Sequence, residues 1–328
     1  MKRKLKHFWW VLKQTFFEFN KDKASIMAAA QAYFTVFALP PMLLLLGMLL
    51  GLFLDGVLIQ QQIKAQAHII GGDAAVNAVQ TIFENLHQAE HQGLLAGLVS
   101  FGVLLFSATN LFTQLQDSLD TIWGVEVKPD AGIKRTLRNR LIGFALILGL
   151  GALVVLSMAS DLVLALAQNF IADRLGLIQY VVLFKALSFG ISFGLLTLAF
   201  AITFSFLPDL KIKLRDVLAG ALFTSLLFSL SRIGLSLYLT HSDLGSAYGT
   251  AGSLMVFLFF IFISMQLFFL GAEFTEVYAR SQGDAFVPDK HAQWLPGRPR
   301  ETELMPQRSP ETETARREKV GEKVRTGR

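Results

Sequence analysis

The residues best suited to bind a charged ligand stand in a stretch that is otherwise apolar. Ser225, Ser229, Arg232 and Ser236 are spaced by four, three and four residues, so on a helix they form one polar stripe. A guanidinium at the centre of a membrane helix costs about 2.5 to 3.5 kcal/mol on insertion scales. Arg232 could snorkel to a membrane surface, but helical side chains tilt toward the N-terminus, here the more distant surface. We therefore favour a polar interior and contact with an anionic group such as a phosphate.

Two further charged residues, Asp161 and Lys185, stand at the outer ends of two apolar stretches. With Arg232 they are predicted to form an outward-opening cavity, in which one acid offsets one of two cations and leaves a net positive charge. These three residues and the serines of the stripe form the predicted substrate-binding set. The alternative is ordinary anchoring at the membrane surface, which is the favoured interpretation for Lys185 taken alone.

A second polar stripe could line an inner vestibule. Asn110, Gln114 and Asp117 follow the three-and-four spacing of one helix face and run out of an apolar stretch toward a basic segment. An equally good interpretation is that Asn110 and Gln114 only hydrogen-bond a neighbouring helix inside the membrane.

No residues of the sequence combine into a recognisable catalytic or cofactor site. The absence of cysteine excludes disulfides, thiolate metal sites and a cysteine nucleophile. Glu84, His87 and His91 have the spacing of one helical face, but a solvated polar face is the favoured interpretation. Hydrolysis of RNA would need clustered carboxylates and histidines, and the sequence has neither these nor a phosphate-binding loop. We predict no enzyme activity, cofactor, metal or nucleic-acid partner.

The sequence around these residues is that of a membrane protein. Of its 328 residues 53% are hydrophobic and 17% charged, which excludes an ordinary soluble enzyme and a disordered chain. A hydrocarbon layer about 30 Å thick needs a helix of about 20 apolar residues. Six stretches meet this requirement, and only the fifth contains a charge, Arg232. The predicted fold is all-α, a polytopic bundle of six transmembrane helices at residues 33–54, 94–112, 141–160, 186–207, 217–239 and 252–272.

The positive residues predict the orientation of these spans. Of the 30 Lys and Arg residues, 26 fall in the termini and in alternate connections, and two fall in the connections on the other side. Because positive residues near a span are retained in the cytoplasm, both termini are predicted to be cytoplasmic. The expected location is a membrane, with membrane lipids as partners. An envelope protein partner and a homo-oligomer are also compatible with the sequence.

Three regions are predicted along the chain. Residues 1–32 form an amphipathic helix at the cytoplasmic membrane surface; a plain extension of the first span is the alternative. Residues 33–279 form the transmembrane domain, in which the long connection 55–93 folds into external amphipathic helices. The proline-rich residues 280–328 are predicted to be a disordered cytoplasmic tail.

Two local packing features are also predicted. In the fourth span, small residues that include Gly190 and Gly194 recur on one face, which permits the close approach of another helix. Pro40 and Pro41 stand near the middle of the first span, and they are predicted to kink or break it.

Three segments resemble a known family. They are AAAQAYFTVFALPPMLLLL at 28–46, SATNLFTQLQDSLDTIWGV at 107–125 and AYGTAGSLMVFLFFIFISMQLFFLGAEF at 247–274. In this combination the chain resembles the YihY/BrkB-type bacterial inner-membrane proteins. The resemblance implies a six-helix protein of the Gram-negative inner membrane. It also brings an old label as a tRNA-processing ribonuclease of the ribonuclease BN kind, an association with virulence and serum resistance, and a suggested role in moving lipid or lipopolysaccharide precursors. It implies no catalytic residues.

These observations favour a transport function, namely movement of an anionic amphiphile or lipid across the bilayer. The alternative is a membrane scaffold or partner subunit for envelope assembly, recruited by the external helices or by the basic tail. The tRNA-processing ribonuclease is the least favoured function, because the sequence offers no nuclease site.

Overall fold

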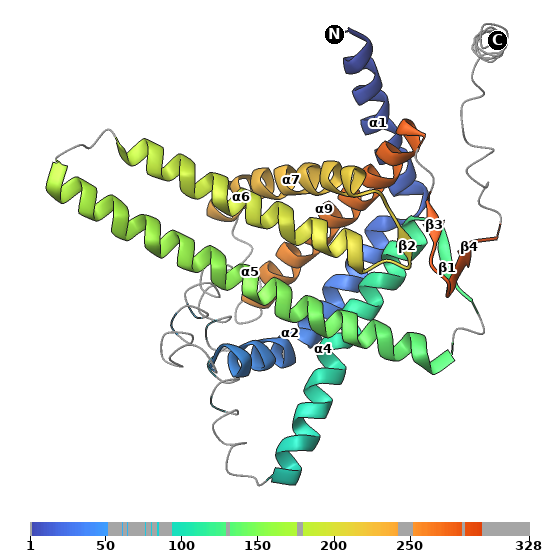
Figure 1. The fold of residues 1–328 in the computed structure, drawn as a ribbon, viewed down its shortest axis with the longest axis horizontal. Helices are drawn as coiled ribbons and strands as arrows, with labels where there is room; N and C mark the ends of the chain where they lie inside the picture. Colours follow the sequence, from blue (N-terminus) through green and yellow to red (C-terminus); the bar gives the residue numbers. More distant parts are fainter. Residues whose placement is uncertain are drawn as a thin grey trace, which may run out of the picture.

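The chain is a bundle of long helices with a small strand layer at one end. The computed structural model describes residues 2–51, 94–128, 132–175, 180–241, 252–283 and 286–296, and the single positions 61, 64, 76, 80 and 84. The helices, labelled as in Figure 1, are α1 (Lys2–Lys21), α2 (Ala24–Gly51), α4 (Leu94–Ile122), α5 (Gly132–Leu175), α6 (Tyr180–Phe206), α7 (Leu214–His241) and α9 (Gly252–Gln282).

Four helices are long and apolar enough to cross a membrane, judged by length and composition. Within the described residues they contain the stretches Leu137–Ser157, Phe184–Phe206, Leu214–Ser231 and Phe257–Gln282. These stretches overlap the third to sixth predicted spans.

The first two predicted spans fall on α2 and α4. Both are helical, but many of their side chains lie outside the described residues, so the count of six spans stays a prediction. Helix α2 continues through Pro40 and Pro41, so the expected break at these prolines is wrong, and the alternative of a kink stays a prediction.

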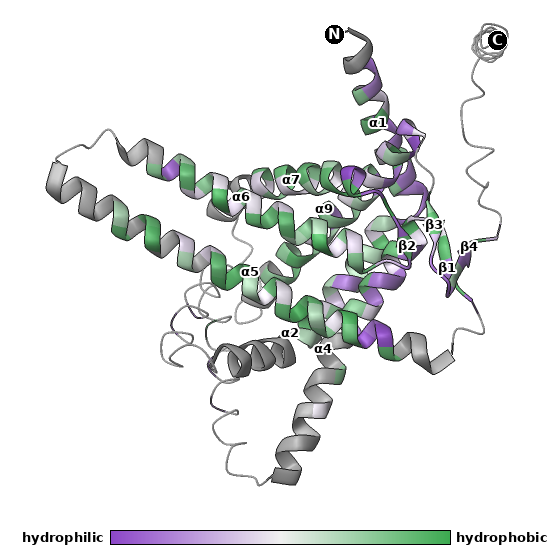
Figure 2. Cartoon of the chain, in the orientation of Figure 1, coloured by the Kyte–Doolittle hydropathy of each residue, from purple (hydrophilic) through white to green (hydrophobic). Residues whose placement is uncertain are grey.

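The apolar side chains divide between a core and an outward surface. The core includes Trp123, Phe204 and Phe269, which are fully buried. The outward surface includes a row of leucines four residues apart on α7: Leu214, Leu218, Leu222, Leu226 and Leu230. Figure 2 shows apolar residues along the lengths of the helices and polar residues gathered at the end where the strands lie. Apolar rows of this length are favourable against hydrocarbon, so we assign the leucine row to the lipid.

Helices α7 and α9 approach each other through a reciprocal pair of glycine–threonine contacts. A Cβ atom on Gly220 would collide with the Thr275 side chain, and a Cβ atom on Gly271 would collide with that of Thr224. Each threonine hydroxyl donates to the glycine carbonyl one turn earlier, at 2.7 Å on α7 and 2.8 Å on α9. In this Gly–Thr clasp the missing side chains let the two backbones pack closely.

Only part of the small-residue face predicted on the fourth span is buried among the described residues. Thr197 and Ala201 are buried, because α6 packs on α7 and α9 near the strand-bearing end, where the rings of Phe200 and Phe228 lie 4.9 Å apart. Gly190 and Gly194 are exposed, with no other heavy atom of the described residues within 4 Å of a Cβ position. Within the described part of the chain no helix approaches this pair, so the close approach that it permits stays a prediction.

One end of the bundle, which we call the polar end, carries two short antiparallel ladders (Figure 1). Strand β1 (Val125–Val127) pairs with β4 (Ala292–Trp294), and β2 (Leu210–Lys211) pairs with β3 (Val287–Pro288). The all-α prediction omits these ladders. The tail predicted to be disordered from residue 280 is instead ordered in its first part, with α9 reaching Gln282 and residues 286–296 paired across the polar end. The reason is that β1 and β2 offer backbone partners that composition does not reveal. We call residues 286–296 the strap.

Helix α1 ends before the predicted boundary at residue 32. Lys23 adopts a left-handed φ of 55°, and α2 starts at Ala24. One side of α1 packs on α9, where Val11 clusters with Phe274 and Val277. The opposite side exposes five aromatic rings, those of Phe8, Trp9, Trp10, Phe16 and Phe17.

The connection 55–93 lies almost wholly outside the described residues, and with it the predicted external helices. Of the three residues with a metal-like spacing, His87 and His91 lie outside and Glu84 is exposed. The five described positions are helical, and Lys64 Nζ donates to Gln80 Oε1 at 3.3 Å.

Candidate functional site

The polar stripe begins with a buried serine on α7. Ser225 is fully buried, and its Oγ has no hydrogen-bond partner among the described residues. Ser229 is half-buried and donates its hydroxyl to the Ser225 carbonyl at 2.8 Å. Arg232 and Ser236 follow on the same helix, and their side chains lie outside the described part. The structure thus describes the inner half of the stripe, and its role in binding stays a prediction.

The outer charges are not brought together within the described residues. Lys185 is exposed near the start of α6 and forms no ion pair with a described carboxylate. Asp161 belongs to α5, a helix of 44 residues and about 66 Å, and its side chain lies outside the described part. The cavity predicted from these two residues and Arg232 therefore stays a prediction.

The predicted vestibule residues lie along α4. Asn110 and Gln114 are half-buried, and Asp117 is exposed. In the same layer the buried Gln31 of α2 donates its Nε2 to the Leu111 carbonyl at 3.2 Å. This hydrogen bond joins α2 to α4 but involves neither Asn110 nor Gln114, so both interpretations of the stripe stay predictions.

The polar end holds an ion network that the sequence did not reveal. The Arg138 guanidinium on α5 contacts two carboxylates, Asp209 in the α6–α7 turn and Asp289 in the strap, each at 2.6 Å. The Asp209 amide donates to Asp120 Oδ1 on α4 at 2.8 Å, and the Asp289 amide donates to the Asp209 carbonyl at 2.8 Å. One network therefore ties two helix ends, one turn and the strap.

The electrostatics of this network favour ionised acids. The hydrogen bond from Arg138, followed by one from the Lys290 amide, holds the pKa of Asp289 below its ordinary value. Asp289 is therefore ionised at neutral pH and remains paired with the guanidinium. The sequence does not predict the Arg138–Asp289 pair, because Asp289 lies in a segment whose composition predicts disorder.

A second network joins α1 to α9. Arg280 lies 2.7 Å from Glu276 and 3.8 Å from Glu18, and Lys21 lies 2.7 Å from Glu18. Burial alone would raise the pKa of Glu18, but hydrogen bonds from Lys21 and Gln14 and the charge of Arg280 outweigh it, so the pKa is lowered. Glu18 thus stays charged and fixes the amphipathic helix to the bundle.

Buried carboxylates are frequent at this end: Asp120, Asp209, Asp216, Glu273 and Glu276 are each at most 5% exposed. Burying a charge is unfavourable unless it is paired, and Arg138 and Arg280 supply part of the compensation. Among the described residues no group of three or more His, Asp or Glu is arranged to hold a metal ion. The contacts of Arg138 and Arg280 join helix ends, which gives the two networks a structural role.

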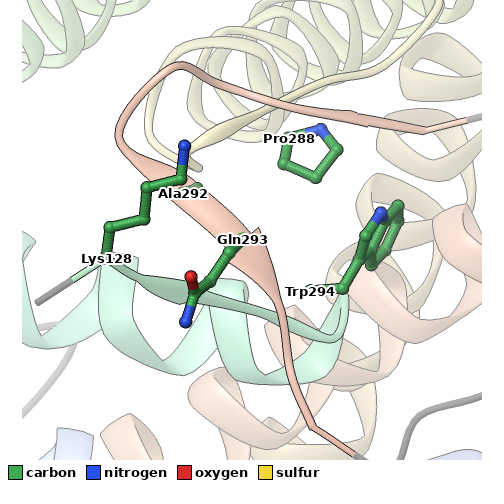
Figure 3. Close-up of a pocket in the computed structure, with 5 residues that line it drawn as sticks. All are labelled: Lys128, Pro288, Ala292, Gln293 and Trp294. Atoms are coloured by element: carbon green, nitrogen blue, oxygen red, sulfur yellow. The ribbon is translucent and has the colours of Figure 1, made fainter.

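Beside the first network a cleft of about 660 Å³ opens on the strand layer (Figure 3). Its walls are Lys128, Pro288, Ala292, Gln293 and Trp294. Lys128 Nζ donates to the Lys290 carbonyl at 3.0 Å, and Gln293 Nε2 donates to Glu126 Oε1 at 2.9 Å. No pattern in the sequence predicts this cleft, since Lys128 contributes only to the predicted orientation and the other four residues lie in the predicted tail.

Bacterial membrane proteins resemble the chain at low identity. A UPF0761 membrane protein of Kangiella koreensis is 21% identical over 79% of the chain and 61% of its own length. One of Alkalilimnicola ehrlichii is 26% identical over 80% of the chain and 56% of its own length. A protein of Bacillus subtilis named ribonuclease-like protein YfkH is 26% identical over 80% of the chain and 92% of its own length. The chain spans somewhat more than half the length of the first two relatives. No solved structure matches it.

The family model of the virulence factor BrkB matches residues 15–295. The match begins in α1, includes every helix from α2 to α9 and ends in the strap, so the strand layer lies within the shared region. With its four apolar helices and its membrane-protein relatives, the chain is a membrane protein that belongs to the virulence factor BrkB family.

Proposed function

We propose that this protein moves an amphiphile or lipid with an anionic head across the bacterial inner membrane. The observation that carries the proposal is the division of α7 into two faces. The leucine row is exposed, whereas Ser225 is fully buried with an unpaired hydroxyl oxygen among the described residues. A buried polar atom without a partner is unfavourable, so it favours a polar neighbour such as water or a ligand head group at this position.

Helical register extends this face toward Arg232. Residues on a helix advance by about 100° each, so position 232 falls about 20° from position 225. At the level of Arg232 the exposed leucines are Leu226 and Leu230, which lie about 100° and 140° from position 225 by the same geometry. The backbone of Arg232 thus belongs to the buried face of α7 and not to the lipid face. A cation on that face would attract an anionic head group, while the acyl chains of the ligand could remain in the bilayer.

The proposal includes an arrangement in the membrane. In this arrangement α2 and α4 are the first two of six spans, and the Lys and Arg residues of the polar end support a cytoplasmic position for that end and for both termini. The exposed aromatic rings of α1 lie at the cytoplasmic surface of the bilayer, as Trp and Phe beside Lys favour.

The test is reconstitution of the purified chain into vesicles of phosphatidylethanolamine and phosphatidylglycerol that contain fluorescent phosphatidylglycerol. Dithionite, which bleaches only the outer leaflet, reports the rate at which the probe changes leaflet. Wild-type vesicles should exchange the probe faster than protein-free vesicles, and Arg232→Ala should slow the exchange by about tenfold or more, since it removes a charge-assisted contact.

Arg215→Ala is the matched control, because Arg215 lies on the same helix but is 66% exposed at its polar end. It should exchange the probe at the wild-type rate. Equal rates in wild-type and protein-free vesicles would refute lipid movement, and equal rates in Arg232→Ala and wild-type would refute the role of the α7 face.

A further inference from the structure

We propose that the cleft on the strand layer binds the phosphate group of an anionic ligand, with Lys128 as the cation that contacts it. The residues concerned lie in the α4–α5 connection and the strap, and none belongs to the polar face of α7. The inference is therefore independent of lipid movement.

The position of the Lys128 ammonium is the first support. The ammonium carries three donors, and one is used by the Lys290 carbonyl at 3.0 Å. The backbone amide of Lys128 donates to the His291 carbonyl at 3.0 Å, so both ends of the residue are fixed to the strap. No carboxylate of the described residues forms an ion pair with it. A held ammonium with two donors left and no ion pair to a described carboxylate is suited to receive an anion.

The neighbouring acids are already engaged, which is the second support. The Arg138 guanidinium forms ion pairs with the carboxylates of Asp209 and Asp289. The Glu126 carboxylate accepts a hydrogen bond from Gln293. Lys211 and Lys290, by contrast, are exposed on the same strand layer and form no ion pair with a described carboxylate. Together with Lys128, these two lysines supply positive charge on the strand layer that would attract an anion.

The apolar wall of the cleft defines the rest of the ligand. Figure 3 shows the rings of Trp294 and Pro288 near each other on one side of β4 and the Lys128 side chain on the other. The volume of about 660 Å³ lies in the range of small-molecule sites and far exceeds that of a phosphate ion. The ligand is thus a phosphate ester whose organic part covers the indole ring. A phospholipid head group and a soluble phosphate ester share this chemistry.

The experiment measures tryptophan fluorescence of the full chain in a maltoside detergent during titration with inorganic phosphate and with glycerol 3-phosphate. A second arm compares nanodiscs of phosphatidylcholine with nanodiscs that also contain phosphatidylglycerol. A saturable change is expected in at least one arm, and Trp294→Phe should abolish it. Lys128→Gln should weaken the binding by about tenfold or more, and Lys128→Arg should retain most of it.

Lys213→Gln is the matched control, since Lys213 is an exposed lysine at the same end and does not line the cleft. It should bind as the wild type does. A response to phosphatidylglycerol alone assigns the site to a lipid head group, and a response to glycerol 3-phosphate assigns it to a soluble ester.

No response to any probe, or equal binding by Lys128→Gln and wild-type protein, overturns the proposal. Thermal unfolding of each variant establishes that a lost response is not lost folding. Arg232→Ala must still bind, because the site does not include the α7 face, and this result separates a failure of the cleft from a failure of lipid movement.

Discussion

Gly220 of α7 lies so close to Thr275 of α9 that a methyl group does not fit between them. The same relationship recurs in reverse between Gly271 and Thr224, one turn further along each antiparallel helix. Both hydroxyls are satisfied within their own helices, so the contact between the helices depends on shape rather than on hydrogen bonds across the interface. Packing of this kind is the main source of helix association where lipid surrounds the protein.

Substitution of Gly220 by alanine should therefore destabilise the protein by about 1 to 3 kcal/mol, the usual result of overpacking a tight contact. Thermal unfolding in detergent measures the effect. Gly234→Ala is the control on the same helix, because no heavy atom of the described residues outside its own stretch of helix lies within 4 Å of its Cβ position. If the two variants unfold at the same temperature, the clasp is not a stabilising contact.

Acid should loosen the strap. The folded pKa of Asp289 lies below its ordinary value of 3.8, so its stabilising contribution is present at neutral pH and is lost as the pH falls below about 4 through the folded pKa. The pair is partly exposed, which limits the contribution to about 1 kcal/mol. Hydrogen exchange of residues 286–296 should rise at low pH in the wild type. Asp289→Asn should show the raised exchange already at neutral pH, whereas Asp117→Asn should not.

The polar face of α7 should be reachable by water-soluble thiol reagents. The chain has no cysteine, so single cysteines can be introduced without a background. Cysteine at 229, 232 or 236 should react, because hydrated positions stabilise the thiolate. Cysteine at 222, 226 or 230, on the leucine row, should not react in a bilayer. Labelling of the leucine positions with protection of the serine positions would invert the assignment of the two faces.

The outward rings of α1 should lie in the bilayer surface. Trp9 is 73% exposed and Trp10 is 51% exposed, whereas Trp123 is 1% exposed in the core. Brominated lipids quench tryptophans that they contact, so they should quench wild-type emission and have much less effect on the Trp9→Phe, Trp10→Phe double variant. Equal quenching of the two proteins would mean that α1 stands away from the membrane.

The long helices could be predicted from the sequence. In a chain with so few charges, a run of about 20 apolar residues indicates a membrane-spanning helix. The third to sixth predicted spans all coincide with apolar helices. The exposure of aromatic residues on α1 also follows from its composition.

The tertiary contacts could not be predicted in the same way. The Gly190 and Gly194 pair on α6 has the more familiar spacing for close packing, yet the described structure leaves it exposed and uses Gly220 and Gly271 instead. The strap contains strands of only two and three residues, which are too short to show the alternation of apolar and polar residues typical of a strand. The partners of Arg138 lie 71 and 151 residues away, a separation at which local patterns carry no information.

The strap also determines when the polar end can be completed during synthesis. Strands β1 and β2 emerge from the ribosome well before β3 and β4, so their edges remain unpaired until the last helix has been made. Unpaired edges are prone to wrong pairing and are a common feature of intermediates that chaperones and proteases recognise. A nascent chain interrupted after α9 would carry its helices with an unfinished polar end, and the strap thereby distinguishes a complete molecule from an incomplete one.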